Sequence, residues 1–268
     1  MPEDREQAVM EHVDVVVIGG GAAGLMCALT AGRRGRRVLV LERSKRCGKK
    51  ILMSGGGRCN FTNLHVTPER FLGANPHFHK SALARYTQWD FIALVDAHGI
   101  AWHEKELGQL FCDESSKQIV AMLLDECARA GVRIAVESEV QRIRPQGEGF
   151  SLSTTLGELA CESLVIASGG LSIPKMGATG FGHRIARQFG HGVVEPRAAL
   201  VPFTLPPPTL EPYRDLKGVS QDVIAQCNGA SFRAGMLFTH RGLSGPAMLQ
   251  VSSYWQPGDA VAIDLLPD

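Results

Sequence analysis

Three glycines and one carboxylate are spaced in this sequence as a dinucleotide site requires. Gly19, Gly21 and Gly24 occupy the glycine positions of G-x-G-x-x-G, and Glu42 follows 18 residues after Gly24. The first glycine permits a tight turn, the second lets backbone approach a pyrophosphate, and the third lets a helix pack closely on a sheet. A carboxylate placed like Glu42 accepts hydrogen bonds from ribose hydroxyls and repels a 2′-phosphate. The pattern favours FAD or NAD over NADP.

The segments around these residues form the pattern of a βαβ unit. An apolar run at 13–18 precedes the glycine turn, a small-residue helix is predicted at 25–34, and a second apolar run at 37–42 ends on Glu42. The start of the helix offers free N–H groups and a partial positive charge to phosphates. The alternative is a glycine turn with a purely structural role. We predict pyrophosphate contacts from Gly19, Gly21, Ala22, Ala23 and Gly24, and ribose contacts from Glu42 and Arg43.

Farther along the chain, the apolar pattern predicts helices at 80–99 and 118–130, with a hairpin or a loop near the ligand at 104–112. Between 132 and 154 apolar and polar residues alternate with a period of two, which predicts a small meander of strands. A buried strand at 163–168 then ends on small residues, where a cofactor would pass the sheet edge. We predict cofactor contacts from Val140, Ser168 and Gly169. Together these features resemble the FAD domain of glutathione-reductase-like flavoproteins.

The segment 43–63 is rich in glycine and in hydrogen-bond donors. Glycines allow close approach to a flat ligand, and the polar side chains supply donors for an anionic cofactor. A donor near the N5 or N1/O2 edge of a flavin would stabilise the reduced anionic ring. An ordinary exposed loop, or pairing of the cations with the pyrophosphate, is the alternative. The predicted contacts from this segment are Lys50, Ser54, Gly55, Gly57, Arg58 and Asn60.

The composition indicates a globular protein without a strong overall field. The 268 residues include 28 basic and 27 acidic side chains, so the net charge of +1 does not favour nucleic acid or anionic lipid as a partner. Seven cysteines without C-x-x-C spacing fit neither a disulfide framework nor a zinc site. The polar start of the chain at 2–6 and the lack of a long apolar run predict a soluble cytoplasmic protein. We expect no metal.

A proline-rich stretch at 202–212 separates two regions of different character. We predict an α/β fold with two domains: a Rossmann-like FAD-binding domain at 1–195 and an inserted, mostly β, barrel-like domain at 196–268, which is expected to be incomplete.

Two segments, 49–63 and 237–247, resemble the BaiN-like flavoproteins, also described as aminoacetone-oxidase-like FAD-binding enzymes. The resemblance runs from Asp14 to Asp268. It implies a bacterial cytoplasmic flavoprotein with noncovalent FAD in a Rossmann-like domain and an inserted β domain. Members of this group return after the inserted domain to a segment that completes the flavin site, and they commonly have Asp at the position of Phe181. The chain is therefore expected to be short at its C-terminus.

The candidates for catalysis are Arg58, Asn60 and His240. His240 could titrate near neutral pH as an acid or base facing the substrate, although a structural histidine in a turn is the more common case. Cys59 lies beside cations that would lower the pKa of a thiol, yet a packed cysteine is more common than a catalytic one. His77 and His79 are spaced like metal ligands but have no evident third ligand.

These residues favour an FAD-dependent oxidoreductase that transfers hydride between a small organic substrate, or NAD(P)H, and an acceptor. Only one G-x-G-x-x-G turn lies in a βαβ pattern, so NAD(P)H is expected to bind transiently. The alternative is a truncated flavoprotein with an incomplete flavin site that acts as a binding module. Flavin-dependent RNA modification is disfavoured by the neutral charge, and the oligomeric state is left open.

Overall fold

The structure is a computed structural model that describes residues 10–268. The polar segment at 2–6, on which the expectation of a cytoplasmic protein partly rests, lies outside these residues. The chain divides into two compact units, Met1–Val193 and Val194–Asp268.

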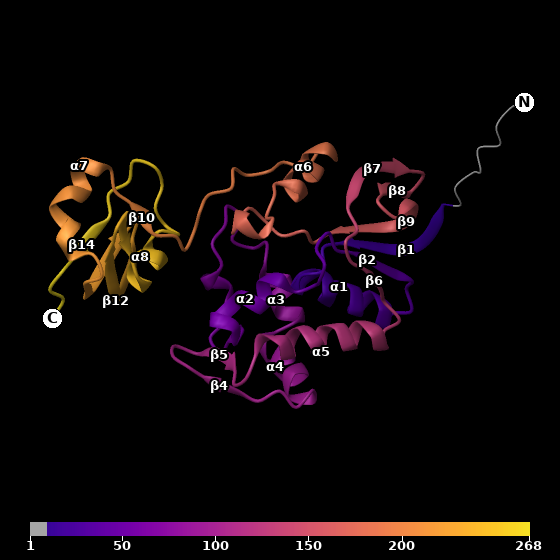
Figure 1. The fold of residues 1–268 in the computed structure, drawn as a ribbon, viewed down its shortest axis with the longest axis horizontal. Helices are drawn as coiled ribbons and strands as arrows, with labels where there is room; N and C mark the ends of the chain where they lie inside the picture. The colour runs from indigo at the N-terminus through magenta and orange to yellow at the C-terminus, as the bar shows by residue number, and fades with distance from the viewer. Residues whose placement is uncertain (1–9) are drawn as a thin grey trace, which may run out of the picture. The chain divides into compact units, whose positions relative to one another are not determined.

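The first unit is built on a six-stranded mixed sheet (Figure 1). Its first four strands in space are parallel to one another, and the last three form an antiparallel meander that shares β9 with the parallel part. The strands follow the order β6 (Arg133–Ala135), β2 (Val38–Leu41), β1 (Glu11–Ile18), β9 (Gly157–Ile166), β8 (Gly149–Thr154) and β7 (Val140–Gln146).

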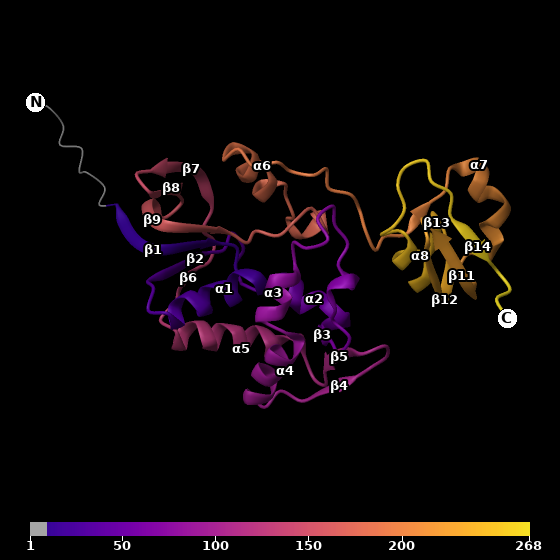
Figure 2. The same cartoon turned by 180° about the vertical axis from the view of Figure 1, so that it is seen from behind.

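The central strands are apolar because both of their faces are covered. Val15 and Val17 of β1 face a core that contains α1 (Ala22–Arg33) and α5 (Ser116–Arg129). Val16 and Ile18 face a second core, which includes residues of the meander and of α6 (Phe181–Gln188). Figures 1 and 2 show α1 and α5 on one side of the sheet and α6 on the other. A parallel sheet buried on both faces is typical of α/β folds and confirms the predicted fold class.

Two strand predictions were wrong in detail. The residues 133–136 were expected to open the meander, but β6 instead pairs in parallel with β2, with Ile134 opposite Val40. The strand predicted at 163–168 is the end of β9, which pairs with β8 through its first half and with β1 along nearly its whole length. A period of two identifies a strand but does not identify its partner.

The helix predicted at 80–99 is two helices, α3 (Lys80–Arg85) and α4 (Gln88–Ala97). Thr87 separates them as the N-cap of α4, and its hydroxyl and the Asp90 carboxylate form a capping box. The region 104–112 contributes to a hairpin of β4 (Trp102–Glu104) and β5 (Gln109–Cys112), which pairs with β3 (Asn60–Asn63). The remaining short elements of this unit are α2 (Lys49–Met53), η1 (Ser54–Gly57), η2 (Pro68–Arg70) and η3 (Pro174–Met176).

The second unit is mostly β. Its five-stranded antiparallel sheet has the order β10 (Phe203–Thr204), β13 (Gly242–Ser244), β12 (Ala230–Thr239), β11 (Ser220–Cys227) and β14 (Ala262–Asp264). The helix α8 (Pro246–Val251) packs on this sheet through Ala247, Met248 and Val251, all of which are buried. In the sequence, two short helices precede the hairpin of β11 and β12: α7 (Pro207–Leu210) and η4 (Glu211–Leu216). Over residues 10–268, every helix is too short or too polar to cross a bilayer.

Candidate functional site

The carboxyl ends of β1, β2 and β9 lie side by side and border a cavity of about 700 Å³. Its size is in the range of small-molecule and cofactor sites. The cavity lies where the parallel strands of an open α/β sheet expose their ends, which is the usual position of a ligand in such folds. All of the residues that line it belong to the first unit.

The three fingerprint glycines serve two different purposes. A Cβ on Gly24 would lie 1.8 Å from the Gly19 carbonyl oxygen, and a Cβ on Gly19 would lie 2.4 Å from that of Ala167. These two glycines therefore allow the turn, α1 and the end of β9 to approach one another. Gly21 has no atom within 4 Å of the position of a Cβ, and as N-cap of α1 it supplies no side-chain cap. The open space and the uncapped helix start fit a pyrophosphate.

Two backbone N–H groups hold the side-chain carboxylate of Glu42. Its Oε2 accepts a hydrogen bond from the Gly20 N–H at 2.8 Å, and its Oε1 accepts one from the Ser44 N–H at 2.7 Å. Each carboxylate oxygen can accept a further hydrogen bond. The carboxylate is therefore oriented by the protein and still able to bind ribose hydroxyls.

The cavity brings together most of the residues predicted to bind a cofactor. Residues of the turn, the end of β2, the start of α2, the first residue of β7 and the end of β9 all line it. The predicted cofactor-binding residues that line the cavity are Gly19, Gly21, Ala22, Ala23, Glu42, Arg43, Lys50, Val140, Ser168 and Gly169.

The other predicted residues lie outside the cavity lining. Gly24 packs against Gly19, as described above, and the Ser54 hydroxyl donates to the Ile51 carbonyl at 2.8 Å. Arg58 and Asn60 are exposed, and no part of the hairpin region 104–112 reaches the cavity. Contacts of Ser54, Gly55, Gly57, Arg58 and Asn60 with a flavin ring remain predictions.

The sequence prediction missed two segments of the wall. Ser138, Glu139 and Gln141 flank Val140, and the loop at 176–179 leads into α6, which adds Phe181, Arg184, Ile185 and Gln188. The glycines at 177, 180 and 182 are the local sequence signal that could have indicated this loop. Phe181, where the BaiN-like group commonly has Asp, packs on the second core and lines the cavity.

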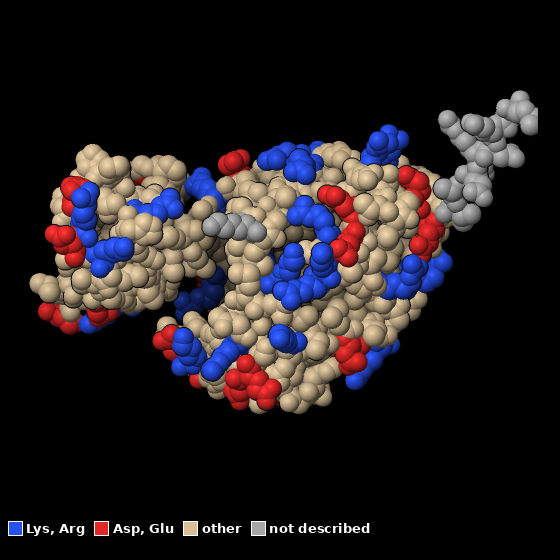
Figure 3. Space-filling model, viewed as in Figure 1, with Lys and Arg blue, Asp and Glu red and all other residues tan. Residues whose placement is uncertain are grey.

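Two cations join opposite parts of the wall. Arg43 Nη2 donates to the Gly177 carbonyl at 2.7 Å, and Lys50 Nζ donates to the Ser172 hydroxyl at 2.8 Å. Four basic side chains line the cavity, from Arg43, Lys49, Lys50 and Arg184, against the two carboxylates of Glu42 and Glu139. Figure 3 shows groups of basic side chains with fewer acidic ones beside them on one face of this unit. The wall is suited to a ligand with two negative charges.

The cysteines near the cavity are buried thiols. Burial, together with the nearby Glu42 carboxylate, raises the pKa of Cys47 to about 11. Burial also raises the pKa of Cys59. A raised pKa keeps both groups protonated and weakly nucleophilic, which supports a packing role for Cys59.

His240 belongs to the second unit, in the turn between β12 and β13, and its side chain is exposed. Thr239 shapes this turn, since its hydroxyl accepts a hydrogen bond from the Arg241 N–H at 3.2 Å and donates to the Gly242 carbonyl at 2.9 Å. The turn therefore presents His240 and Arg241 to solvent.

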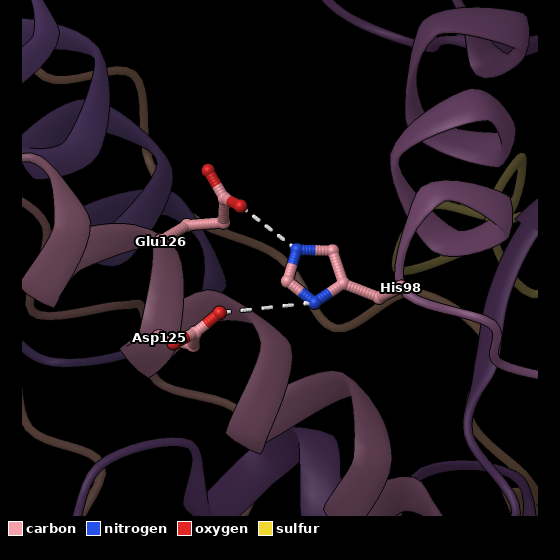
Figure 4. Close-up of side chains that lie close together, drawn as sticks. All are labelled: His98, Asp125 and Glu126. Carbon is pink, nitrogen blue, oxygen red and sulfur yellow. Dashed lines mark hydrogen bonds and ion pairs between the residues drawn. The ribbon is translucent and has the colours of Figure 1, made fainter.

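A second polar cluster, away from the cavity, contains the His98, Asp125 and Glu126 side chains (Figure 4). Their ligand atoms lie within 4.8 Å of one another, as a metal site requires. However, Glu126 binds His98 Nε2 at 2.8 Å and also Arg33, and Asp125 binds Arg129 at 2.8 Å. Because these cations already neutralise both carboxylates, we interpret the cluster as an ion-pair network that joins α1, the end of α4 and α5.

The sequence matches that of a family described as HI0933-like protein Rossmann domain over residues 13–247. Ribosomal RNA dihydrouridine synthase of Escherichia coli (strain K12) is 59% identical over 260 residues, covering 97% of this chain and 65% of that protein. The protein of the same name from Haemophilus influenzae is 53% identical over 270 residues, covering 96% and 65%. The 3-dehydro-bile acid delta(4,6)-reductase of Clostridium scindens is 27% identical over 266 residues, covering 94% and 64%.

The chain thus spans just under two thirds of the length of these relatives. The family match does not single out the BaiN-like group to which the sequence motifs are similar. The Rossmann match and the cavity together support FAD as the cofactor.

Substitution of the fingerprint glycines should separate cofactor binding from folding. Gly21→Val places its side chain in the open space of the cavity, so we expect FAD affinity to fall at least about tenfold, with a loss of stability of no more than about 1 kcal/mol. Gly24→Val would place its side chain against the Gly19 carbonyl, so we expect it to lower both the FAD affinity and the stability. The measurements are FAD titration and thermal unfolding of the apoprotein.

Gly192→Val is the matched control, because no atom lies within 4 Å of its Cβ position and it is not part of the cavity lining. Normal FAD binding by Gly21→Val would contradict the placement of the pyrophosphate.

The ion-pair network should contribute a pH-dependent stability. The hydrogen bond from His98, together with Arg33, holds the pKa of Glu126 below its ordinary value of 4.5. A depressed pKa stabilises the fold above the ordinary value, and this contribution is lost as pH falls through the folded-state pKa. We expect Glu126→Gln to lower the free energy of unfolding by about 1–3 kcal/mol near neutral pH and by much less near pH 3.

Urea unfolding of wild type and variant at several pH values measures this difference. Glu148→Gln, in the exposed β7–β8 turn, is the matched control and should change little. An equal effect of Glu126→Gln at every pH would argue against the ionic role.

Proposed function

Because the chain belongs to the HI0933-like family, we propose that it is an FAD-dependent oxidoreductase that reduces uridine in ribosomal RNA to dihydrouridine. The observation that carries the substrate is the 59% identity, over 97% of the chain, to the Escherichia coli protein named for this product. The more distant relative, at 27% identity, is also named a reductase.

This proposal replaces two expectations from the sequence. Hydride transfer is kept, but uridine in RNA takes the place of the small organic substrate, and RNA becomes a partner. The expectation of no nucleic acid rested on a net charge of +1, which averages over the whole chain and does not describe any one surface. A match over nearly the whole chain has more weight than that average.

Reduction of the uracil C5–C6 double bond requires one hydride and one proton. Bound FAD supplies the hydride after it has been reduced by a donor such as NAD(P)H. The protein holds the cofactor through Gly21 and the start of α1 at the pyrophosphate and through Glu42 at the ribose. Arg43 and Lys50 supply positive charge at the wall. Since one G-x-G-x-x-G turn serves FAD, we propose that NAD(P)H binds only transiently.

The proton must come from an acid near the uracil ring. We propose His240 as this acid, because imidazole donates protons near neutral pH and the β12–β13 turn exposes it. We also retain Arg58 and Asn60 as donors at the flavin edge, where they would stabilise negative charge on the reduced ring.

The first test is reduction of RNA by the purified chain. We expect a bound-flavin absorption spectrum, bleaching by NADH or NADPH, and formation of dihydrouridine in ribosomal RNA transcribed in vitro, detected by mass spectrometry as a gain of two hydrogens. Glu42→Arg should lose FAD and activity together. His240→Ala should keep FAD and lower the rate of uridine reduction by about 10²-fold or more.

Flavin reduction without dihydrouridine, but with turnover of small organic acceptors, would favour the substrate class expected from the sequence. A folded chain that takes up no FAD would favour the alternative of a binding module with an incomplete flavin site.

A further inference from the structure

The segment between Glu42 and Glu69 is strongly basic and holds no acidic residue. It contains six of the 28 basic residues and none of the 27 acidic residues. The six cations lie within 16 positions, at Arg43, Lys45, Arg46, Lys49, Lys50 and Arg58. Because the whole chain carries only +1, the rest of the molecule is acidic by comparison.

Most of these cations have no partner in the protein. Arg43 and Lys50 bond to Gly177 and Ser172, as described above. The side chains of the other four form neither an ion pair nor a hydrogen bond with any residue in 10–268: Lys45, Arg46, Lys49 and Arg58. Lys45, Arg46 and Arg58 are also exposed.

The other basic cluster of the sequence, at 33–37, has a different environment. Arg33 binds Glu126, Arg36 lies 3.4 Å from Glu162, and Arg37 lies 2.7 Å from Asp14. The protein's own carboxylates thus pair with three of the four arginines of this cluster, all but Arg34, and the cluster precedes β2 at the end away from the cavity. The segment 43–58 also carries Arg and Lys side chains, but none of them forms an ion pair with a carboxylate of residues 10–268.

Two of the free cations lie at the rim of the cavity. Lys45 and Arg46 are outside its lining but fall between Ser44 and Gly48, which line it, whereas Lys49 lines the cavity beside Arg43 and Lys50. The wall carries four cations and two carboxylates, so the two negative charges of a pyrophosphate would balance it. Lys45 and Arg46 remain available for a second anion.

The backbone beside these cations is open. The turn Ser54–Gly57 holds three glycines with positive φ, and at Gly56 and Gly57 no atom lies within 4 Å of the position of a Cβ. Met53, next to this turn, is 58% exposed. An extended chain could therefore lie against the turn and contact the cations on its flanks.

We propose that the basic rim, defined as Lys45 and Arg46 and bordered by Lys49 of the cavity wall, is the surface that binds the phosphate backbone of the RNA substrate. This inference rests on the proposed function, because it is the RNA substrate that supplies a polyanion. Exposed cations at the mouth of the cofactor cavity would bind phosphates on either side of the reacting uridine and hold the base at the cavity. Backbone phosphates fix the position of a nucleic acid on a protein without reading its sequence.

The test is binding of a fluorescently labelled fragment of ribosomal RNA to the FAD-loaded protein, followed by anisotropy across a range of salt concentrations. We expect the double variant Lys45→Glu/Arg46→Glu to bind at least about tenfold more weakly than wild type at low salt. Loss of two phosphate contacts should reduce the slope of log affinity against log salt by about 1.4–1.8. Its FAD affinity should match wild type, since neither residue lines the cavity.

The matched control is Arg34→Glu/Arg36→Glu, which makes the same change in net charge at the opposite end of the strands. It breaks only an exposed ion pair, of the kind that contributes little to stability. We expect its RNA affinity to stay within about twofold of wild type. Equal losses in both double variants, or a loss in neither, would overturn the proposal.

Two further outcomes separate the rim from the proposed function and from other partners. RNA binding that depends on the rim, without dihydrouridine formation by wild type, would keep the surface and reject the reaction. Dihydrouridine formation with an unchanged KM for RNA in Lys45→Glu/Arg46→Glu would keep the reaction and reject the surface. Loss of poly-glutamate binding in this variant, with RNA binding unchanged, would assign the rim to an acidic protein and overturn the proposal.

Discussion

The geometry of the cavity depends on backbone contacts that leave no room for a side chain. Gly24 lies against the carbonyl of Gly19, and Gly19 lies against that of Ala167. These contacts set the spacing between the end of β1, the start of α1 and the end of β9. The bond from the Gly20 N–H to Glu42 then fixes the end of β2 to the same turn. In the proposed function, one arrangement of four backbone segments would place both the pyrophosphate and the ribose.

The sequence predicts the geometry of this turn well because its determinants are local. Gly19, Gly24 and Glu42 belong to one βαβ unit, where each residue's role follows from its position relative to the turn. The break at Thr87 was also locally encoded, since Thr87 and Asp90 have the spacing of a capping box, but the apolar pattern on both sides concealed it.

The rest of the wall could not be predicted because it depends on partners distant in sequence. Ser138 and Gln141 reach the cavity only because the chain passes from β6, beside β2, to the far edge of the sheet at β7. The loop at 176–179 reaches it because Arg43 binds the Gly177 carbonyl, a contact between residues 134 positions apart. Alternation of apolar and polar residues indicates which face of a strand is buried, but it does not identify the neighbouring strand.

The same limit applies to net charge as an argument about nucleic acid. A cation contributes to the field at a surface only to the extent that the fold leaves it without a carboxylate nearby. Arg37 and Lys45 are equivalent in a count of charges, yet the fold places Asp14 against Arg37 and no acid against Lys45 among residues 10–268. The pairing of β1 with β2 brings Asp14 to Arg37, whereas Lys45 follows the end of β2 at the cavity. The path of the chain therefore decides which basic residues can act on a ligand.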